Sequence, residues 1–305
     1  MKRLLLWLGG VSVLVFLAGI SISVLFNPVP DNPLPPNQEP KFRSESNPAT
    51  PQKSPETPVA DDHDTKTIAN ANIENNQPRV AIVIDDLGWD PRTAKLYDRV
   101  SVPLTMALLP ERPRSQMFYE RWKHQFEFII HMPMEPEGYP DDDPGKGALM
   151  TTMDREQVRE YLKNVFETYP RALGINNHMG SAFTADRERM SYVMEFLSEN
   201  DLYYFDSGTS AKSKALEMAN RWNVPVIKNQ VFLDNRRDPE SIHNQLEKLV
   251  ERAREQGSAV GIGHIQSQKT AQVLARQLPR LEEKGIEFVP LSQMVGLPRL
   301  HARNP

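Results

Sequence analysis

The chain has 305 residues, of which 39% are hydrophobic and 25% are charged, so it is long enough to bury the core of an ordinary globular protein. A formal net charge of -4, without a basic stripe interleaved with aromatic residues, excludes a protein built to bind nucleic acid. The sequence has no cysteine, which excludes disulfides and thiolate ligands. Any metal must therefore be held by His, Asp, Glu or similar side chains.

Residues 4–26 form an uncharged apolar run that follows Lys2 and Arg3. As a helix, this run is long enough to cross a hydrocarbon core of about 30 Å. The alternative is a cleaved signal peptide, but the apolar core of a signal usually has only about 7–15 residues. We therefore predict a transmembrane anchor over residues 1–26. Because the positively charged flank stays in the cytoplasm, we expect an inner-membrane protein whose residues after position 26 face the periplasm. If the segment is cleaved as a signal peptide, we expect the remaining protein to be periplasmic.

Residues 27–78 are crowded with Pro, Asn, Ser and acidic residues and contain almost no aromatic or branched apolar side chain. Such a segment buries too little surface to offset its ordering entropy, so we predict a disordered linker. The folded domain is then expected over residues 79–297. Residues 298–305 show no periodicity and are predicted to be a tail.

Short apolar runs alternate with amphipathic helical patterns across the predicted domain, and three long helices are predicted to begin after Asp154, Asp238 and Ser267. Runs of this length, without polar alternation, are typical of strands buried on both faces. The alternation predicts a parallel (β/α) barrel with seven or eight strands, with an open doubly wound sheet as the alternative. The predicted strands cover residues 80–85, 104–109, 126–131, 172–177, 202–206, 224–228, 259–264 and 286–290.

Polar residues stand at the ends of several predicted strands, and active sites of parallel barrels lie where the carboxyl ends of the strands meet. These residues are Asp85, Asp86, His131, Asn176, Asn177, His178, Asp206 and His264. Taken singly, each has a structural explanation, because an aspartate can cap a turn and a histidine can be buried against a carbonyl. Taken together, Asp86, His131 and His178 offer one oxygen and two nitrogens, which suits a divalent metal such as zinc with an open coordination position.

Other polar residues are candidates for substrate binding. Glu135 lies in a long loop rich in Pro, Gly and Asp that is expected to overhang the strand ends, although a solvated loop is an equal alternative. Asn177 and Asp206 stand at strand ends and are assigned to the same role. Asp206 could also orient a ligand through a hydrogen bond or cap the helix expected after Gly208, and Asp234 in FLDN is open to the same two interpretations.

The segments IDDLG, LTMALLP, IIHMPMEP, GINNHMGSAFT, YFDSGT, FLDN and GIGH resemble the divergent polysaccharide deacetylase family over residues 79–297. The resemblance implies a distorted barrel that uses a divalent metal to remove acetyl groups from N-acetylated sugars. It also implies that Asp85 is the catalytic base, Asp86 a metal ligand and His264 the general acid. We expect Asp85 and His264 on opposite sides of the metal.

One motif departs from the wider superfamily, which has two histidines four residues apart after the third strand. This chain has His131 there, with Glu135 at the spacing of the second histidine. His178, on the next strand end, is the expected substitute ligand. The implied substrate is an N-acetylated glycan such as peptidoglycan. The alternative is a catalytically silent relative that binds a glycan or an envelope protein.

Overall fold

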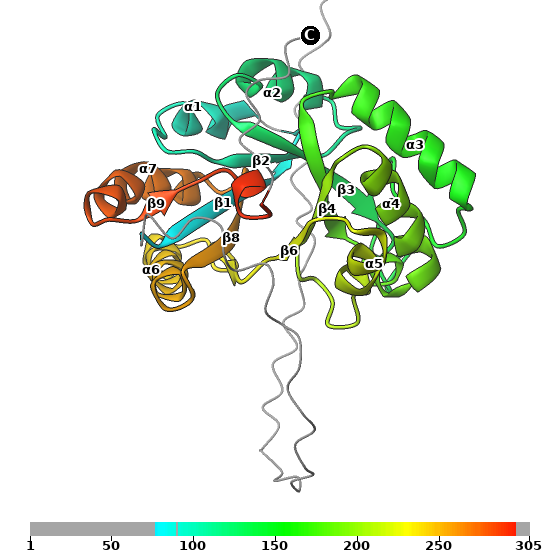
Figure 1. Cartoon of the computed structure of the whole chain (residues 1–305). Helices are drawn as coiled ribbons and strands as arrows, with labels where there is room; N and C mark the ends of the chain where they lie inside the picture. Colours follow the sequence, from blue (N-terminus) through cyan, green and yellow to red (C-terminus); the bar gives the residue numbers. More distant parts are fainter. Residues whose placement is uncertain (1–76, 90, 297–305) are drawn as a thin grey trace, which may run out of the picture. The chain divides into compact units, whose positions relative to one another are not determined.

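The computed structural model describes residues 77–89 and 91–296, and Figure 1 shows their arrangement. The expected anchor over residues 1–26, nearly all of the expected linker and the expected tail lie outside the described residues. Within the described part, no helix combines the length and the apolar character needed to cross a membrane. The predicted anchor and linker therefore stay predictions from the sequence.

The described residues form a nine-stranded sheet in which neighbouring strands run parallel, with the order β6-β5-β4-β3-β2-β1-β8-β7 and β9 paired to β1. This order advances steadily around the sheet, whereas a doubly wound sheet reverses at a switch point. The predicted distorted barrel is confirmed. The strands are β1 (Arg79–Leu87), β2 (Thr105–Leu108), β3 (Glu127–Met134), β4 (Ala172–Met179), β5 (Tyr203–Asp206), β6 (Val226–Lys228), β7 (Val231–Phe232), β8 (Ser258–His264) and β9 (Glu287–Phe288).

One extended segment connects the two ends of the sheet. Strand β6 pairs with β5, and β7 pairs with β8, although only Asn229 and Gln230 separate β6 from β7 in the chain. The backbone N–H of Gln230 donates to the carbonyl of Val260, which fixes the crossing. The barrel is thus closed by the covalent chain and not by a ladder between β6 and β7. Strand β7, which has only two residues, was not predicted from the sequence.

Helices cover the outside of the sheet (Figure 1). The three long helical patterns predicted from sequence appear as α3, α6 and α7, and each begins at a side-chain cap: Asp154, Asp238 and Ser267 accept backbone N–H groups of the first turn. The helices are α1 (Ala94–Tyr97), α2 (Ser115–Trp122), α3 (Arg155–Thr168), α4 (Arg187–Glu199), α5 (Ala215–Trp222), α6 (Pro239–Gln256) and α7 (Gln268–Glu283).

Two apolar cores lie on the two faces of the sheet. The larger core contains residues such as Ile82, Ile84 and Ile175 together with the buried faces of the helices. The smaller core contains strand residues together with Val289 and Leu291 of the C-terminal segment, and no residue of α1 to α7, so it fills the barrel interior. Its members from β1, β3, β5 and β8 are Ala81, Val83, Ile129, Tyr203, Phe205, Val260 and Ile262. Because side chains alternate along a strand, the next inward positions are Asp85, His131 and His264.

The amino ends of the strands are packed against the C-terminal segment. Leu291 belongs to the interior core, and its backbone N–H donates to Thr105. The buried carboxylate of Glu127 accepts hydrogen bonds from Thr105 Oγ1 at 3.0 Å, Tyr203 OH at 2.9 Å and the Ser292 N–H at 3.0 Å. Burial raises the pKa of Glu127, and these hydrogen bonds oppose that rise. The polar residues of the candidate site lie at the other, carboxyl end of the barrel.

Candidate metal centre

Asp85 and Asp86 both face the barrel interior because strand β1 is irregular at this point. In a regular strand, successive side chains point to opposite faces, so Asp86 would follow Ile84 towards the helices. The β1–β2 register instead shifts between Ile84 and Leu87, and Asp86 adopts a left-handed conformation with φ 66°. Asp tolerates this conformation better than most residues, and bulges of this kind redirect side chains next to active sites.

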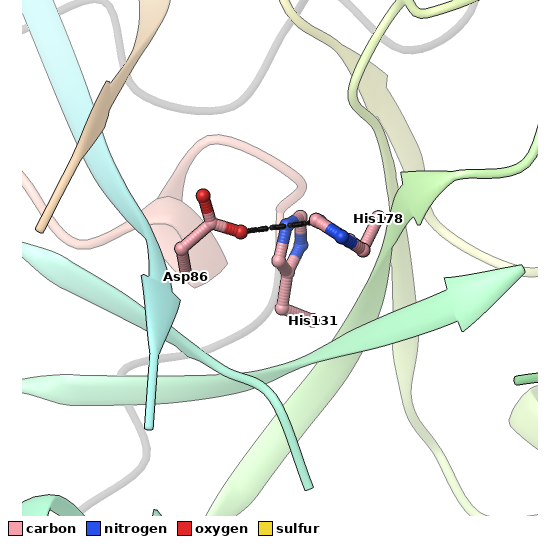
Figure 2. A group of neighbouring side chains, drawn as sticks. All are labelled: Asp86, His131 and His178. Atoms are coloured by element: carbon pink, nitrogen blue, oxygen red, sulfur yellow. Dashed lines mark hydrogen bonds and ion pairs between the residues drawn. The ribbon is translucent and has the colours of Figure 1, made fainter. Parts of the chain in front are cut away.

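The two histidines come from neighbouring strands. His131 lies on β3 opposite Asn176 of β4, and His178 lies two residues further along β4, opposite Pro133. Asn176 and His178 therefore share one face of β4, and this face is the interior one because Ile175 packs into the outer core. Figure 2 shows Asp86, His131 and His178 directed towards one another. The structure thus brings together the three residues predicted as ligands.

The distances suit a shared cation. Asp86 Oδ1 lies 3.2 Å from His131 Nε2 and 3.1 Å from His178 Nδ1, and the two nitrogens are 3.1 Å apart. One ligand atom from each residue can be chosen so that all lie within 4.8 Å. Asp86 Oδ1 is buried, yet none of its neighbours forms a well-aligned hydrogen bond with it. A buried carboxylate oxygen facing two imidazole nitrogens fits the donor set of a divalent metal.

The histidines also control the charge of Asp86. Burial alone would raise the pKa of this carboxyl group, but His131 and His178 outweigh burial and hold the pKa well below its ordinary value. Its other oxygen, Oδ2, accepts a hydrogen bond of 3.0 Å from Gln266 Nε2. Asp86 is therefore ionised over the physiological pH range, as a metal ligand must be.

Asn176 orients His131 and is a residue whose role the sequence analysis missed. Its Oδ1 lies 3.0 Å from His131 Nδ1, and its Nδ2 donates to Asp85 Oδ1 at 3.0 Å and to Ser207 Oγ at 3.1 Å. An amide oxygen only accepts, so His131 Nδ1 donates to Asn176, and in the neutral imidazole Nε2, the nitrogen near Asp86, is the atom free to bind a metal. The position of Asn176, two residues before His178 on one strand, was the available signal.

Asp85 is buried beside the same imidazole. Its Oδ2 lies 3.7 Å from His131 Nε2, and burial raises the pKa of its carboxyl group although His131, His264 and Asn176 oppose the rise. Asp85 is also the register partner of His264 on β8. The two predicted catalytic residues therefore stand side by side on neighbouring strands. The expectation that they lie on opposite sides of a bound metal stays a prediction.

Asp234 orients His264. Asp234 Oδ1 lies 2.7 Å from His264 Nδ1, and Oδ2 accepts both the His264 N–H at 2.9 Å and Thr270 Oγ1 at 2.7 Å. Burial alone would lower the pKa of His264, but the hydrogen bond and charge of Asp234 outweigh it and raise the pKa to about 9. Between the two interpretations left open for Asp234, this geometry favours orientation of a functional side chain.

The three predicted substrate-binding residues make other contacts. Glu135 Oε2 accepts the backbone N–H and the hydroxyl of Thr151, so it braces its own loop. Asn177 faces away from the interior, is buried, and donates to Met179 O and Thr209 Oγ1. Asp206 is buried and accepts from Gly208 N and Ser213 Oγ, so it braces the loop after β5; it does not cap α5, whose N-cap is Lys214. These contacts engage all three side chains within the protein.

A comparison with known protein families matches the part of the chain that contains these residues. The family profile described as divergent polysaccharide deacetylase matches residues 82–295, a span that includes every residue of the site. The chain belongs to the divergent polysaccharide deacetylase family. Among its family relatives, the uncharacterized protein YibQ of Escherichia coli (strain K12) is 31% identical over 228 residues, which is 74% of this chain and 70% of that protein.

A second relative is an uncharacterized protein of Haemophilus influenzae (strain ATCC 51907 / DSM 11121 / KW20 / Rd), 32% identical over 67% of this chain and 73% of that protein. A crystal structure of an uncharacterized protein from Agrobacterium tumefaciens C58 superposes with a TM-score of 0.66 at 24% identity, covering 74% of this chain and 92% of that one. At this identity, the structural similarity supports the fold alone. The resemblance seen in the sequence motifs is confirmed at the level of the family.

Proposed function

We propose that this divergent polysaccharide deacetylase is a metal-dependent hydrolase that removes acetyl groups from an N-acetylated glycan in the cell envelope. The observation that carries the proposal is the convergence of Asp86, His131 and His178 on one point, with Asp85 and His264 on the adjoining strands. Two histidines and one carboxylate are a common ligand set of hydrolytic zinc sites, which leaves a coordination position open. A divalent metal held there would supply Lewis acidity towards the amide carbonyl.

The protein side chains would divide the proton transfers between them. Asp85, as a carboxylate 3.7 Å from His131 Nε2, would accept a proton from the attacking water. His264 is protonated at neutral pH because its pKa is about 9, so its Nε2 can donate a proton to the leaving amine. Asp234 holds the His264 ring through Nδ1, which leaves Nε2 as the donating atom.

Two further observations support the proposed substrate and the proposed cellular location. The family to which the chain belongs is named for polysaccharide deacetylation. The apolar run over residues 4–26 and the polar segment after it favour a domain tethered outside the cytoplasmic membrane. Peptidoglycan is an N-acetylated glycan of that compartment, which makes it the first substrate to test.

The test is release of acetate from N-acetylated oligosaccharides by the purified full-length chain loaded with zinc. Release should require the metal and should fall to background in His131→Ala. The matched control is His124→Ala, an exposed histidine in the turn after α2, which should keep full activity. A chain that binds zinc and glycan but releases no acetate from any N-acetylated glycan would contradict the proposal and favour the silent, glycan-binding alternative.

A further inference from the structure

Trp89 and Arg112 lie next to the candidate metal centre, on the loops that follow β1 and β2. Gly88, two residues after Asp86, has a φ of 141°, and a Cβ atom at this position would lie 2.7 Å from Arg112 Cβ. The backbone of the β1 loop therefore packs directly on Arg112. The guanidinium lies over the indole of Trp89, 4.8 Å from the ring centroid, and Trp89 itself is 48% exposed.

Arg112 is a partly buried cation, and within the described part of the chain it has no ionic partner. Its Nη2 donates to the carbonyl of Pro144 at 3.0 Å, whereas Nε is buried and has no hydrogen-bond partner. Across residues 77–89 and 91–296, no carboxylate lies within ion-pair distance of its guanidinium. The neighbouring Glu111 is engaged elsewhere, because its carboxylate contacts Lys146 Nζ at 3.0 Å and accepts from Tyr161 OH at 3.1 Å.

The electrostatic surroundings of Arg112 include the metal site. Burial lowers the pKa of the guanidinium, and the charges of Asp143 and Asp86 oppose that shift. Among the described residues, Asp143 lies beyond ion-pair distance of Arg112, and its Oδ1 accepts the Gly145 N–H at 2.7 Å. A partly desolvated arginine with an unused donor is costly unless an anion is bound, and the planar fork of arginine matches a carboxylate.

We propose that Arg112 and Trp89 form a subsite for an acidic sugar, with Arg112 binding a carboxylate on the residue adjacent to the N-acetyl group that is cleaved. The exposed indole face of Trp89 would stack on the sugar ring while the guanidinium beneath it binds the carboxylate. The inference rests on the proposed function and narrows its substrate class to N-acetylated glycans that carry carboxylates, as opposed to neutral ones.

The test measures binding, so that it does not depend on turnover. Calorimetry on the full-length, zinc-loaded chain would compare a tetrasaccharide of alternating N-acetylglucosamine and N-acetylmuramic acid with neutral tetra-N-acetylchitotetraose. A charge-assisted hydrogen-bond pair predicts that the acidic ligand binds about 10- to 100-fold more tightly. A third ligand, with the lactyl carboxylates converted to amides, should bind like the neutral one. A uronate-containing N-acetylated tetrasaccharide would distinguish a lactyl carboxylate from a ring carboxylate.

Arg112→Gln should remove the preference for the acidic ligand, and Arg114→Gln should retain it, since Arg114 is an exposed arginine of the same loop. Arg112→Lys keeps the charge and should retain part of the preference, which covers the case in which the glutamine variant does not fold. Equal binding of acidic and neutral ligands by the wild type, or an unchanged preference in Arg112→Gln, would overturn the inference. A preference that depends on Arg112 without acetate release would uphold the subsite and reject the deacetylase function.

Discussion

Asn176 Oδ1 lies 3.0 Å from His131 Nδ1, while the nitrogen of the same amide donates to Asp85. One neutral side chain thus fixes the tautomer of a candidate ligand and the position of the candidate base. A charged residue at this buried position would alter the pKa of both neighbours, whereas an amide connects them without adding charge.

His178→Ala should weaken zinc binding by more than about 100-fold. Loss of a residue that only orients a ligand already costs about 10–100-fold, and His178 is proposed to bind the metal itself. Isothermal titration with zinc, with His124→Ala as the control, measures the change. A fully loaded His178→Ala protein would show that His178 is no ligand and would make Glu135 the next residue to replace.

Asn176→Ala should weaken zinc binding by about 10–100-fold, because His131 would lose the partner that fixes its tautomer. Asn177→Ala is the matched control on the same strand. Its side chain faces outward and holds the loop near Thr209, so this variant should lose about 1–3 kcal/mol of stability but keep its zinc affinity. Equal zinc affinities in both variants would argue against an orienting role for Asn176.

Asp85→Asn and His264→Ala should each lower acetate release by about 10²–10⁴-fold, the usual contribution of a positioned base or acid. Neither residue is among the three proposed ligands, so zinc content measured by atomic emission should stay close to that of the wild type. Loss of zinc from Asp85→Asn would move this residue from the catalytic to the ligand set.

Asp234→Asn should shift the alkaline limb of the pH–rate profile to lower pH. A general acid must be protonated, so activity should fall as the pH rises through about 9, the pKa of His264. Without the charge of Asp234, this limb should move towards the ordinary histidine value of about 6.5. Asp238→Asn, at the cap of α6, is the control and should leave the profile unchanged.

The pair of Asp234 and His264 should also make the free energy of unfolding decrease as the pH rises. Because the folded-state pKa of His264 lies above the unfolded value, its contribution to stability is fully present below about pH 6.5 and is lost as the pH rises through about 9. Chemical denaturation of wild type and Asp234→Asn at pH 6 and pH 10 measures this. A difference between the two proteins that is as large at pH 10 as at pH 6 would contradict the linkage.

The topology prediction comes from sequence alone. Protease added to spheroplasts should release a soluble fragment that begins near residue 79, because the predicted linker over residues 27–78 lies between the anchor and the domain. Immunoblotting with an antibody to the domain detects the fragment. Protection of the entire chain would reverse the predicted orientation.

The sequence by itself determined the alternation of strands and helices and the residues at the strand ends. In a parallel barrel, all strand ends of one polarity meet at one edge, so Asp86, His131 and His178 could be grouped without knowledge of any contact. Helix starts at Asp154, Asp238 and Ser267 were equally accessible, because capping is a local interaction.

Only the tertiary structure decided which strand-end side chains face the interior. The left-handed Asp86 turns inward against the alternation of β1, and the phase of β4 directs Asn176 inward and Asn177 outward. The pairing of Asp234 with His264, 30 positions later, depends on β7 lying beside β8. Such relationships arise from register and from packing between distant segments, and a local sequence pattern carries no information about either.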